Sequence, residues 1–216
     1  YIDIIRQVFA REAPVTNDGP HYPLPYNGED GTGLGKPLKP IVHPLRNHIP
    51  IYMGAEGPKN IALAAEIADG WLPLFYNPYD ESVYAESLAD ARPDFDIAQM
   101  VNVNITDDIE AGLLAFKYFL SFYIGGMGAK STNFHKNLFI RMGYEAEADK
   151  IQQLVMEDKR DEAARVIPDE LADAMALVGP VDRIKDRLQA WRDSRVTTVL
   201  VTAQDVDSLR AIADLW

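Results

Sequence analysis

The segment GAEGPK, residues 54–59, contains the residue types of an anion-binding turn. It lies between an apolar run and an amphipathic stretch with helical spacing. The first N–H groups of a helix have no intrahelical partners and carry partial positive charge, and glycine lets a ligand approach the backbone. A proline in the first turn removes a donor that would lack a partner. The pattern predicts an anion site formed by Gly54, Ala55, Glu56, Gly57, Pro58 and Lys59. A simple tight turn before a helix would have the same spacing.

The charge around this turn favours an anionic ligand. Residues 31–60 carry a net charge of +3 within a chain of −12, from one acidic residue, Glu56, and four basic residues: Lys36, Lys39, Arg46 and Lys59. We therefore expect the loop at 31–48 to lie over the same end of the sheet as the turn, where it would add basic side chains to the anion site.

A second group of candidates lies in the segment GGMGAKSTNFH, residues 125–135. Lys130 is a candidate contact for an anionic part of a substrate, and Asn133 and His135 are candidates for the mouth of a substrate pocket. A helix–helix turn with an exposed lysine explains the same residues equally well. The sequence has no HExxH motif or carboxylate cluster, so we expect no metal site. It does not identify the catalytic residues.

The composition excludes several classes of protein. The chain has 216 residues, 47% of them hydrophobic, which is enough for a substantial core. Its net charge of −12 argues against a nucleic-acid partner, because phosphate backbones bind basic surfaces. There is no cysteine, and no apolar run reaches the length of a membrane span. We expect a cytoplasmic protein with small-molecule ligands, no nucleic-acid or membrane partner, and assembly as a homo-oligomer such as a homodimer.

The predicted elements alternate between strands and helices. Apolar runs predict strands at 49–53, 71–76, 97–105 and 196–202. Residues 13–48, rich in proline and glycine, predict a long loop. Helical spacing predicts helices at 1–12, 59–69 (ended by Gly70), 80–91, 107–124, 134–143, 146–156, 159–166, 168–176, 181–194 and 209–216.

This alternation predicts parallel strands joined by helical crossovers, with the helices packed outside the sheet. The apolar run VTTVLV, residues 196–201, predicts a strand that is buried on both faces. Four strands are too few for an eight-stranded barrel. The chain also begins inside a helical pattern with no N-cap, so we expect it to be a piece of a longer protein.

Several segments resemble the luciferase-like flavin and deazaflavin oxidoreductases, and are most similar to their actinobacterial branch that uses coenzyme F420. The resemblance covers nearly the whole chain, as the C-terminal two-thirds of such a protein. Its motifs occur in the family's order: GTGLGKPLKPIVHPLRNHIPIYMGAEGPKNIALAAEIADGWLPLFY, FYIGGMGAKSTNFHKNL, RMGYE, IPDELADAMALVGPVDRIKDRL and VTTVLVTA.

The resemblance implies an α/β fold, the (β/α)8 TIM barrel, here as a single domain over 1–216 that lacks the first strands. It places the phosphate-bearing tail of the cofactor at a glycine-containing turn after the fifth strand, which corresponds to residues 54–58. Glu56 would then turn its carboxyl away and offer only its N–H. The implied activity is hydride transfer between coenzyme F420 and an unknown organic substrate. The alternatives are an FMN-dependent monooxygenase and a non-catalytic flavin-binding protein.

Overall fold

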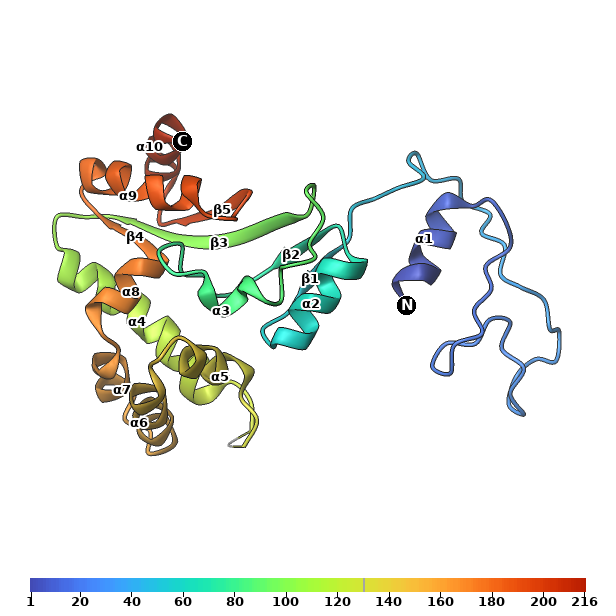
Figure 1. Cartoon of the computed structure of the whole chain (residues 1–216), viewed down its shortest axis with the longest axis horizontal. Helices are drawn as coiled ribbons and strands as arrows, with labels where there is room; N and C mark the ends of the chain where they lie inside the picture. Colours follow the sequence, from blue (N-terminus) through green and yellow to red (C-terminus); the bar gives the residue numbers. More distant parts are fainter. Residues whose placement is uncertain (130) are drawn as a thin grey trace. The chain divides into compact units, whose positions relative to one another are not determined.

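The protein consists of two compact units, formed by residues Tyr1–Ile51 and Tyr52–Trp216 (Figure 1). The structure is a computed structural model, and it describes residues 1–129 and 131–216. The prediction of a single domain stays a prediction, as does the position of the 31–48 loop over the end of the sheet.

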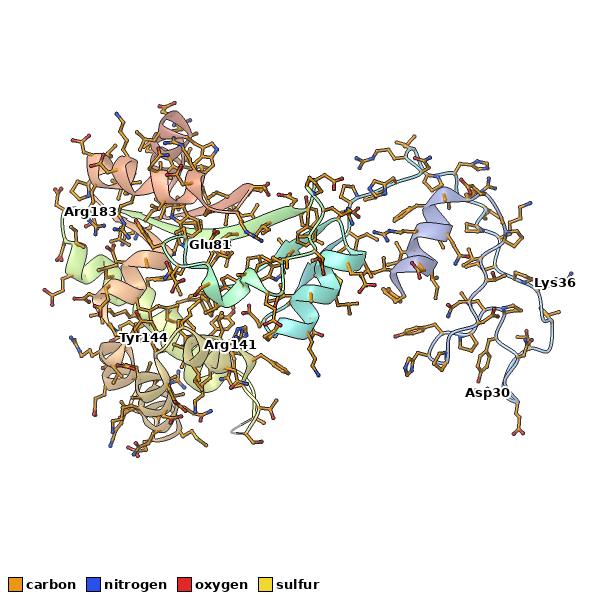
Figure 2. All side chains as sticks on the ribbon, viewed as in Figure 1. Asp30, Lys36, Glu81, Arg141, Tyr144 and Arg183 are labelled. Carbon is orange, nitrogen blue, oxygen red and sulfur yellow. The ribbon has the colours of Figure 1, made fainter. Side chains whose placement is uncertain are left out.

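The first unit contains one helix and the predicted long loop. Helix α1 (Ile2–Ala10) ends at Arg11, which adopts the left-handed conformation with φ 51°. The loop that follows is held by isolated antiparallel bridges between Val15 and Leu38 and between Asn17 and Leu24. Its basic side chains are exposed, and Lys36 projects away from the loop (Figure 2).

The second unit is built on one parallel sheet, which confirms the predicted pairing. Its five strands in the described residues are β1 (Tyr52–Gly54), β2 (Gly70–Leu72), β3 (Asp96–Ile105), β4 (Ala176–Gly179) and β5 (Thr198–Ala203). The order is β1-β2-β3-β4, and β5 also pairs with β3. The long strand β3 therefore pairs with three other strands. This open α/β sheet fits part of a TIM barrel.

Strand β4 is absent from the predicted elements, and the burial of the C-terminal strand was predicted wrongly. The predicted helix at 168–176 ends at Met175, and β4 begins at the next residue. Its sequence, ALVG, has no strong strand preference, and its pairing with Asn102–Ile105 decides its conformation. All of β4 is buried, whereas Leu200 in β5 is 43% exposed.

Two predicted strands are shorter than expected because of proline. The strand predicted at 49–53 begins only at Tyr52, after Pro50, and the strand predicted at 71–76 ends at Leu72, before Pro73. Proline has no N–H to donate to a neighbouring strand, so it interrupts the ladder.

The helices agree with the predictions except in two places. The helix predicted at 80–91 is a single turn, α3 (Ser82–Ala85), and Gly70 does not end the preceding helix. Gly70 instead lies in β2, where a Cβ atom would lie 2.4 Å from the Tyr52 ring and 2.7 Å from the Asp96 carbonyl oxygen. The remaining helices are α2 (Pro58–Ile67), α4 (Ile109–Gly126), α5 (Phe134–Arg141), α6 (Glu145–Met156), α7 (Arg160–Val166), α8 (Asp169–Met175), α9 (Val181–Asp193) and α10 (Val206–Leu215).

Helices cover β4 on more than one side. Helices α4 and α8 contact β4, and so does α9. In Figure 1, α9 and α10 lie above the long strand β3, and α4 to α8 lie below it. Gly112 of α4 packs closely on the sheet, since a Cβ atom there would lie 2.5 Å from Val178 Cγ1.

Candidate functional site

The turn after β1 is held in place through its carbonyl groups. The Trp71 indole Nε1 donates to the Ala55 carbonyl oxygen at 2.8 Å, and the Arg141 Nη2 donates to the Glu56 carbonyl oxygen at 2.7 Å. In a planar trans peptide, the C=O of one residue and the N–H of the next point in opposite directions. The N–H groups of Glu56 and Gly57 therefore point away from Trp71 and Arg141.

Gly57 lies at the start of α2. It is the N-cap residue, with φ −84° and ψ 143°, and a Cβ atom on it would meet nothing within 4 Å. Pro58 occupies the first turn, and Lys59 beside it is exposed. This open space, together with the outward N–H groups and the positive end of the helix, fits a phosphate group.

The Glu56 carboxyl points into the protein, as the resemblance implies. Its side chain is only 12% exposed, and Oε1 accepts a hydrogen bond from the Leu74 N–H at 3.1 Å. Burial raises its pKa from the ordinary 4.5 to about 7, and the Leu74 N–H and the Arg141 charge only partly offset this. Much of the Glu56 population is therefore uncharged at neutral pH.

The structure brings His135 next to Glu56, so members of the two predicted groups meet. The His135 Nδ1 lies 3.8 Å from Glu56 Oε1. The imidazole packs edge-on against Phe75 and Tyr123, with ring centroids 5.9 and 5.0 Å away. Burial lowers the pKa of His135, which favours the neutral ring.

The other two candidates in the segment 125–135 are Asn133 and Lys130. The Asn133 side chain caps α5: its oxygen accepts from the Lys136 N–H at 2.9 Å, and its amide nitrogen donates to the carbonyls of Tyr123 and Ile124. Because the amide is engaged in this way, it supports the loop before α5. Lys130 lies outside the described residues.

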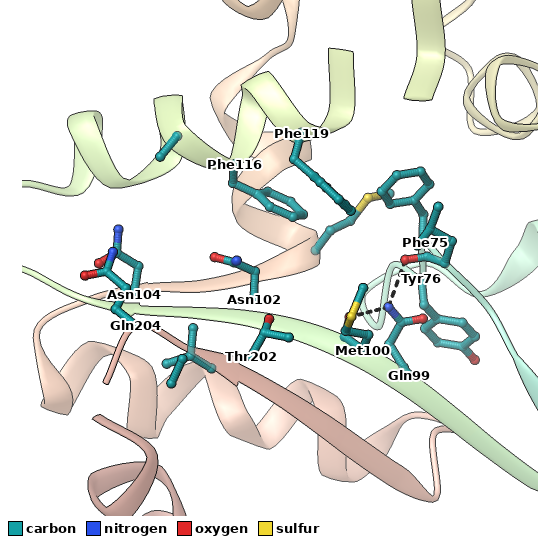
Figure 3. A pocket seen from close by; sticks show the side chains of 15 residues that line it. Phe75, Tyr76, Gln99, Met100, Asn102, Asn104, Phe116, Phe119, Thr202 and Gln204 are labelled. Atoms are coloured by element: carbon teal, nitrogen blue, oxygen red, sulfur yellow. Dashed lines mark hydrogen bonds between the residues drawn. The ribbon is translucent and has the colours of Figure 1, made fainter. Parts of the chain in front are cut away.

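A pocket of about 410 Å³ lies between the sheet and α4 (Figure 3). Uncharged polar side chains from β3 and the end of β5 meet aromatic side chains of α4 there, and none of the described residues that line it carries a charge. Leu74 connects the pocket to the turn, because it lines the pocket and its N–H binds the Glu56 carboxyl. The lining includes Asn102, Asn104, Thr202, Gln204, Phe116 and Phe119.

Comparison with known proteins shows which family the chain belongs to. The luciferase-like monooxygenase family matches residues 1–198 of the chain. The chain belongs to that family. A Mycobacterium tuberculosis protein, whose name provisionally describes it as a coenzyme F420-dependent oxidoreductase, is 51% identical over the whole chain. The chain spans 65% of the length of that relative.

Two solved structures of this luciferase-like fold are similar to the chain. The coenzyme F420-dependent tetrahydromethanopterin reductase from Methanopyrus kandleri has a TM-score of 0.68 and 23% identity, over 97% of this chain and 58% of the other. An F420-dependent secondary alcohol dehydrogenase, in complex with an F420-acetone adduct, has a TM-score of 0.64 and 11% identity, over 100% and 58%. Both confirm the luciferase-like barrel fold.

The part of this luciferase-like chain that the structure describes shows two further features. It contains no helix that is long and apolar enough to cross a membrane. Nor do three His, Asp or Glu side chains of these residues come together in a way that could hold a metal ion.

Two residues that hold the turn were not identified from the sequence of this luciferase-like chain. Arg141 lies 85 residues after Glu56, and no local pattern connects them. Trp71 is fully buried, and its hydrogen-bond partner lies 16 residues earlier in the chain. Its hydrogen bond to Ala55 depends on the parallel pairing of β1 with β2, which sets Met53 opposite Trp71.

Replacing Arg141 by methionine is expected to loosen the turn. Methionine keeps an extended apolar side chain but removes the donor to the Glu56 carbonyl, and hydrogen bonds from charged groups contribute about 1.5–3 kcal/mol. We expect urea denaturation to show a loss of about 1.5 kcal/mol in the free energy of unfolding. Arg160→Met is the control, because the one ion pair that Arg160 forms with the described residues is an exposed one, with Asp158. Equal stability of the Arg141→Met variant and the natural protein would contradict a supporting role for Arg141.

Proposed function

We propose that the chain is part of an oxidoreductase that transfers a hydride between coenzyme F420 and an organic substrate. The observation that carries this proposal is the turn at 54–59, where the N–H groups of Glu56 and Gly57 point away from Trp71 and Arg141, and a Cβ atom at Gly57 would meet nothing within 4 Å. The names of the Mycobacterium relative and of both structural relatives support F420 as the cofactor.

The residues of the chain would bind and orient the cofactor. The backbone of Glu56 and Gly57, with the exposed Lys59, would hold the phosphate of its tail. Trp71 and Arg141 keep the two N–H groups in place before the ligand arrives, so little ordering is required on binding. When bound, coenzyme F420 would donate a hydride from its reduced deazaflavin ring or accept one in its oxidised form.

The pocket beside α4 suits an uncharged organic group. Placing a charged group there would leave it without a partner among the described lining residues, and an unpaired buried charge is costly. Asn102, Asn104 and Thr202 offer hydrogen bonds, and Phe116 and Phe119 offer aromatic surface. We assign this pocket to an uncharged part of the substrate or of the cofactor ring. His135 remains our candidate for a substrate contact.

A calorimetric titration of the full-length protein with coenzyme F420 and with FMN tests the proposed function. We expect binding of F420 at micromolar concentration and much weaker binding of FMN, because the tail of F420 carries more negative charge than FMN. Tighter binding of FMN would favour an FMN-dependent monooxygenase, in which reduced flavin activates oxygen. If neither cofactor binds, the protein is a non-catalytic member of the family. The cytoplasmic location and the homo-oligomeric assembly stay predictions.

A further inference from the structure

The backbone N–H and the side-chain carboxyl of Glu56 have different surroundings. Its backbone N–H points away from Trp71, on the side where the phosphate of a ligand is proposed to bind, and its carboxyl is buried. Only Oε1 accepts a hydrogen bond from the described residues, from Leu74, and Oε2 is buried without a partner among them. A carboxylate with one unsatisfied oxygen is poorly stabilised in its charged form.

The groups that face this carboxyl do not neutralise it fully. From α5, the His135 Nδ1 lies 3.8 Å away and is also buried without a hydrogen bond in the described structure. Arg141, also from α5, directs its Nη2 to the Glu56 carbonyl oxygen, and its charge acts on the carboxyl from a distance. From α3, the Tyr84 hydroxyl donates to the Phe75 carbonyl at 2.9 Å, and burial, followed by the charge of Glu56, raises the pKa of Tyr84.

We propose that Glu56 couples phosphate binding to proton uptake: when a phosphate group binds the N–H groups of Glu56 and Gly57, the buried carboxylate takes a proton from solvent. The inference rests on the proposed function. It adds that a proton binds at Glu56 when the phosphate binds. The physical reason for the coupling is repulsion between the phosphate and the Glu56 carboxylate. The phosphate would bind the backbone of the same residue whose side chain carries the second negative charge, and that buried side chain is poorly screened.

The same coupling makes binding depend on pH. The pKa of Glu56 is raised to about 7, so the carboxyl is mostly neutral at pH 6 and mostly charged at pH 8. If the neutral form binds the phosphate better, affinity falls as the pH rises through this range. Because the neutral fraction falls roughly tenfold between pH 6 and pH 8, we expect a decrease in affinity of roughly three- to tenfold.

Calorimetry of the full-length protein with coenzyme F420 tests the coupling. Titrations at pH 7 in buffers with different ionisation enthalpies give the number of protons taken up per ligand. We expect roughly half a proton for the natural protein. We expect none for Glu56→Gln, and unchanged uptake for Glu66→Gln, since Glu66 is exposed on α2. A deazaflavin without the phosphate-bearing tail should cause no uptake through Glu56. Equal uptake by the natural protein and Glu56→Gln would overturn the proposal.

Failure of F420 to bind would refute the proposed function, and a second measurement then decides the coupling. The Glu56 carboxyl is titrated by NMR with and without sulfate, which keeps its charge between about pH 5 and pH 9 and so serves as a simple anion. The Glu56→Gln variant assigns the signal. A rise in the titration midpoint with sulfate supports the coupling, and an unchanged midpoint overturns it.

Discussion

Replacing Gly57 by leucine is expected to weaken binding of coenzyme F420 at least tenfold, and on the order of a hundredfold if both outward N–H groups are lost. Each hydrogen bond to a charged phosphate contributes about 1.5–3 kcal/mol, and 1.4 kcal/mol corresponds to one factor of ten. A Cβ atom at Gly57 would meet nothing within 4 Å, so we expect the new side chain to occupy the space of the ligand without disturbing the fold. Calorimetry measures the affinity.

Two further variants distinguish an effect on ligand binding from an effect on the stability of the fold. Gly57→Ser places a good N-cap residue at the start of α2, so stability should rise slightly while affinity falls. Ala62→Leu introduces a leucine at an exposed position on α2 and should leave affinity unchanged. If Gly57→Leu binds F420 as tightly as the natural protein does, the phosphate does not lie on this turn.

Glu56→Gln is expected to stabilise the protein at pH 8 by about 3 kcal/mol. The pKa of Glu56 is raised from 4.5 to about 7 in the folded state, and a difference of one pH unit in pKa corresponds to about 1.4 kcal/mol. A raised carboxyl pKa means that the native state holds its proton more tightly. The stability from this proton is fully present below pH 4.5 and is lost as the pH rises through about 7.

Glutamine keeps the acceptor for the Leu74 N–H and cannot ionise. Urea denaturation at pH 5 and at pH 8 should therefore show a gain of less than about 1 kcal/mol at the lower pH and the full gain at the higher one. Glu66→Gln, on the exposed side of α2, is the matched control and should change stability equally little at both values. A gain that is the same at pH 5 and pH 8 would contradict a pH-dependent cost of the buried charge.

Much of the fold could be predicted from the sequence because its signals are local. The alternation of apolar runs with helical spacing predicts parallel strands, and Gly-Pro after an apolar run predicts the start of a helix at Pro58. The Glu56 carboxyl was expected to turn away from a bound phosphate, and in the structure it is buried. Strand β4 could not be predicted, because four residues with little strand preference become a strand only by pairing with Asn102–Ile105.

The support of the site is non-local, and that is why it was missed. Nothing in the segment RMGYE indicates that Arg141 reaches the Glu56 carbonyl. His135 was expected near a substrate, but its distance to Glu56 depends on how α5 packs against the segment after β2. The role of Asn133 as a helix cap could have been predicted, since asparagine is a preferred N-cap residue and α5 begins directly after it.

The position of β3 between distant partners has a consequence for the order of assembly. The Ile97 N–H binds the hydroxyl of Thr197, 100 residues later in the chain, and β5 follows at Thr198–Ala203. A ribosome releases the chain from the N-terminus, so helices α4 to α9 emerge and can form while one edge of β3 still has no partner. Unpaired apolar edges attract other chains. The interval between the synthesis of β3 and the arrival of β5 is therefore the period in which the nascent sheet is most exposed to misassembly, and the time at which a chaperone would protect it most.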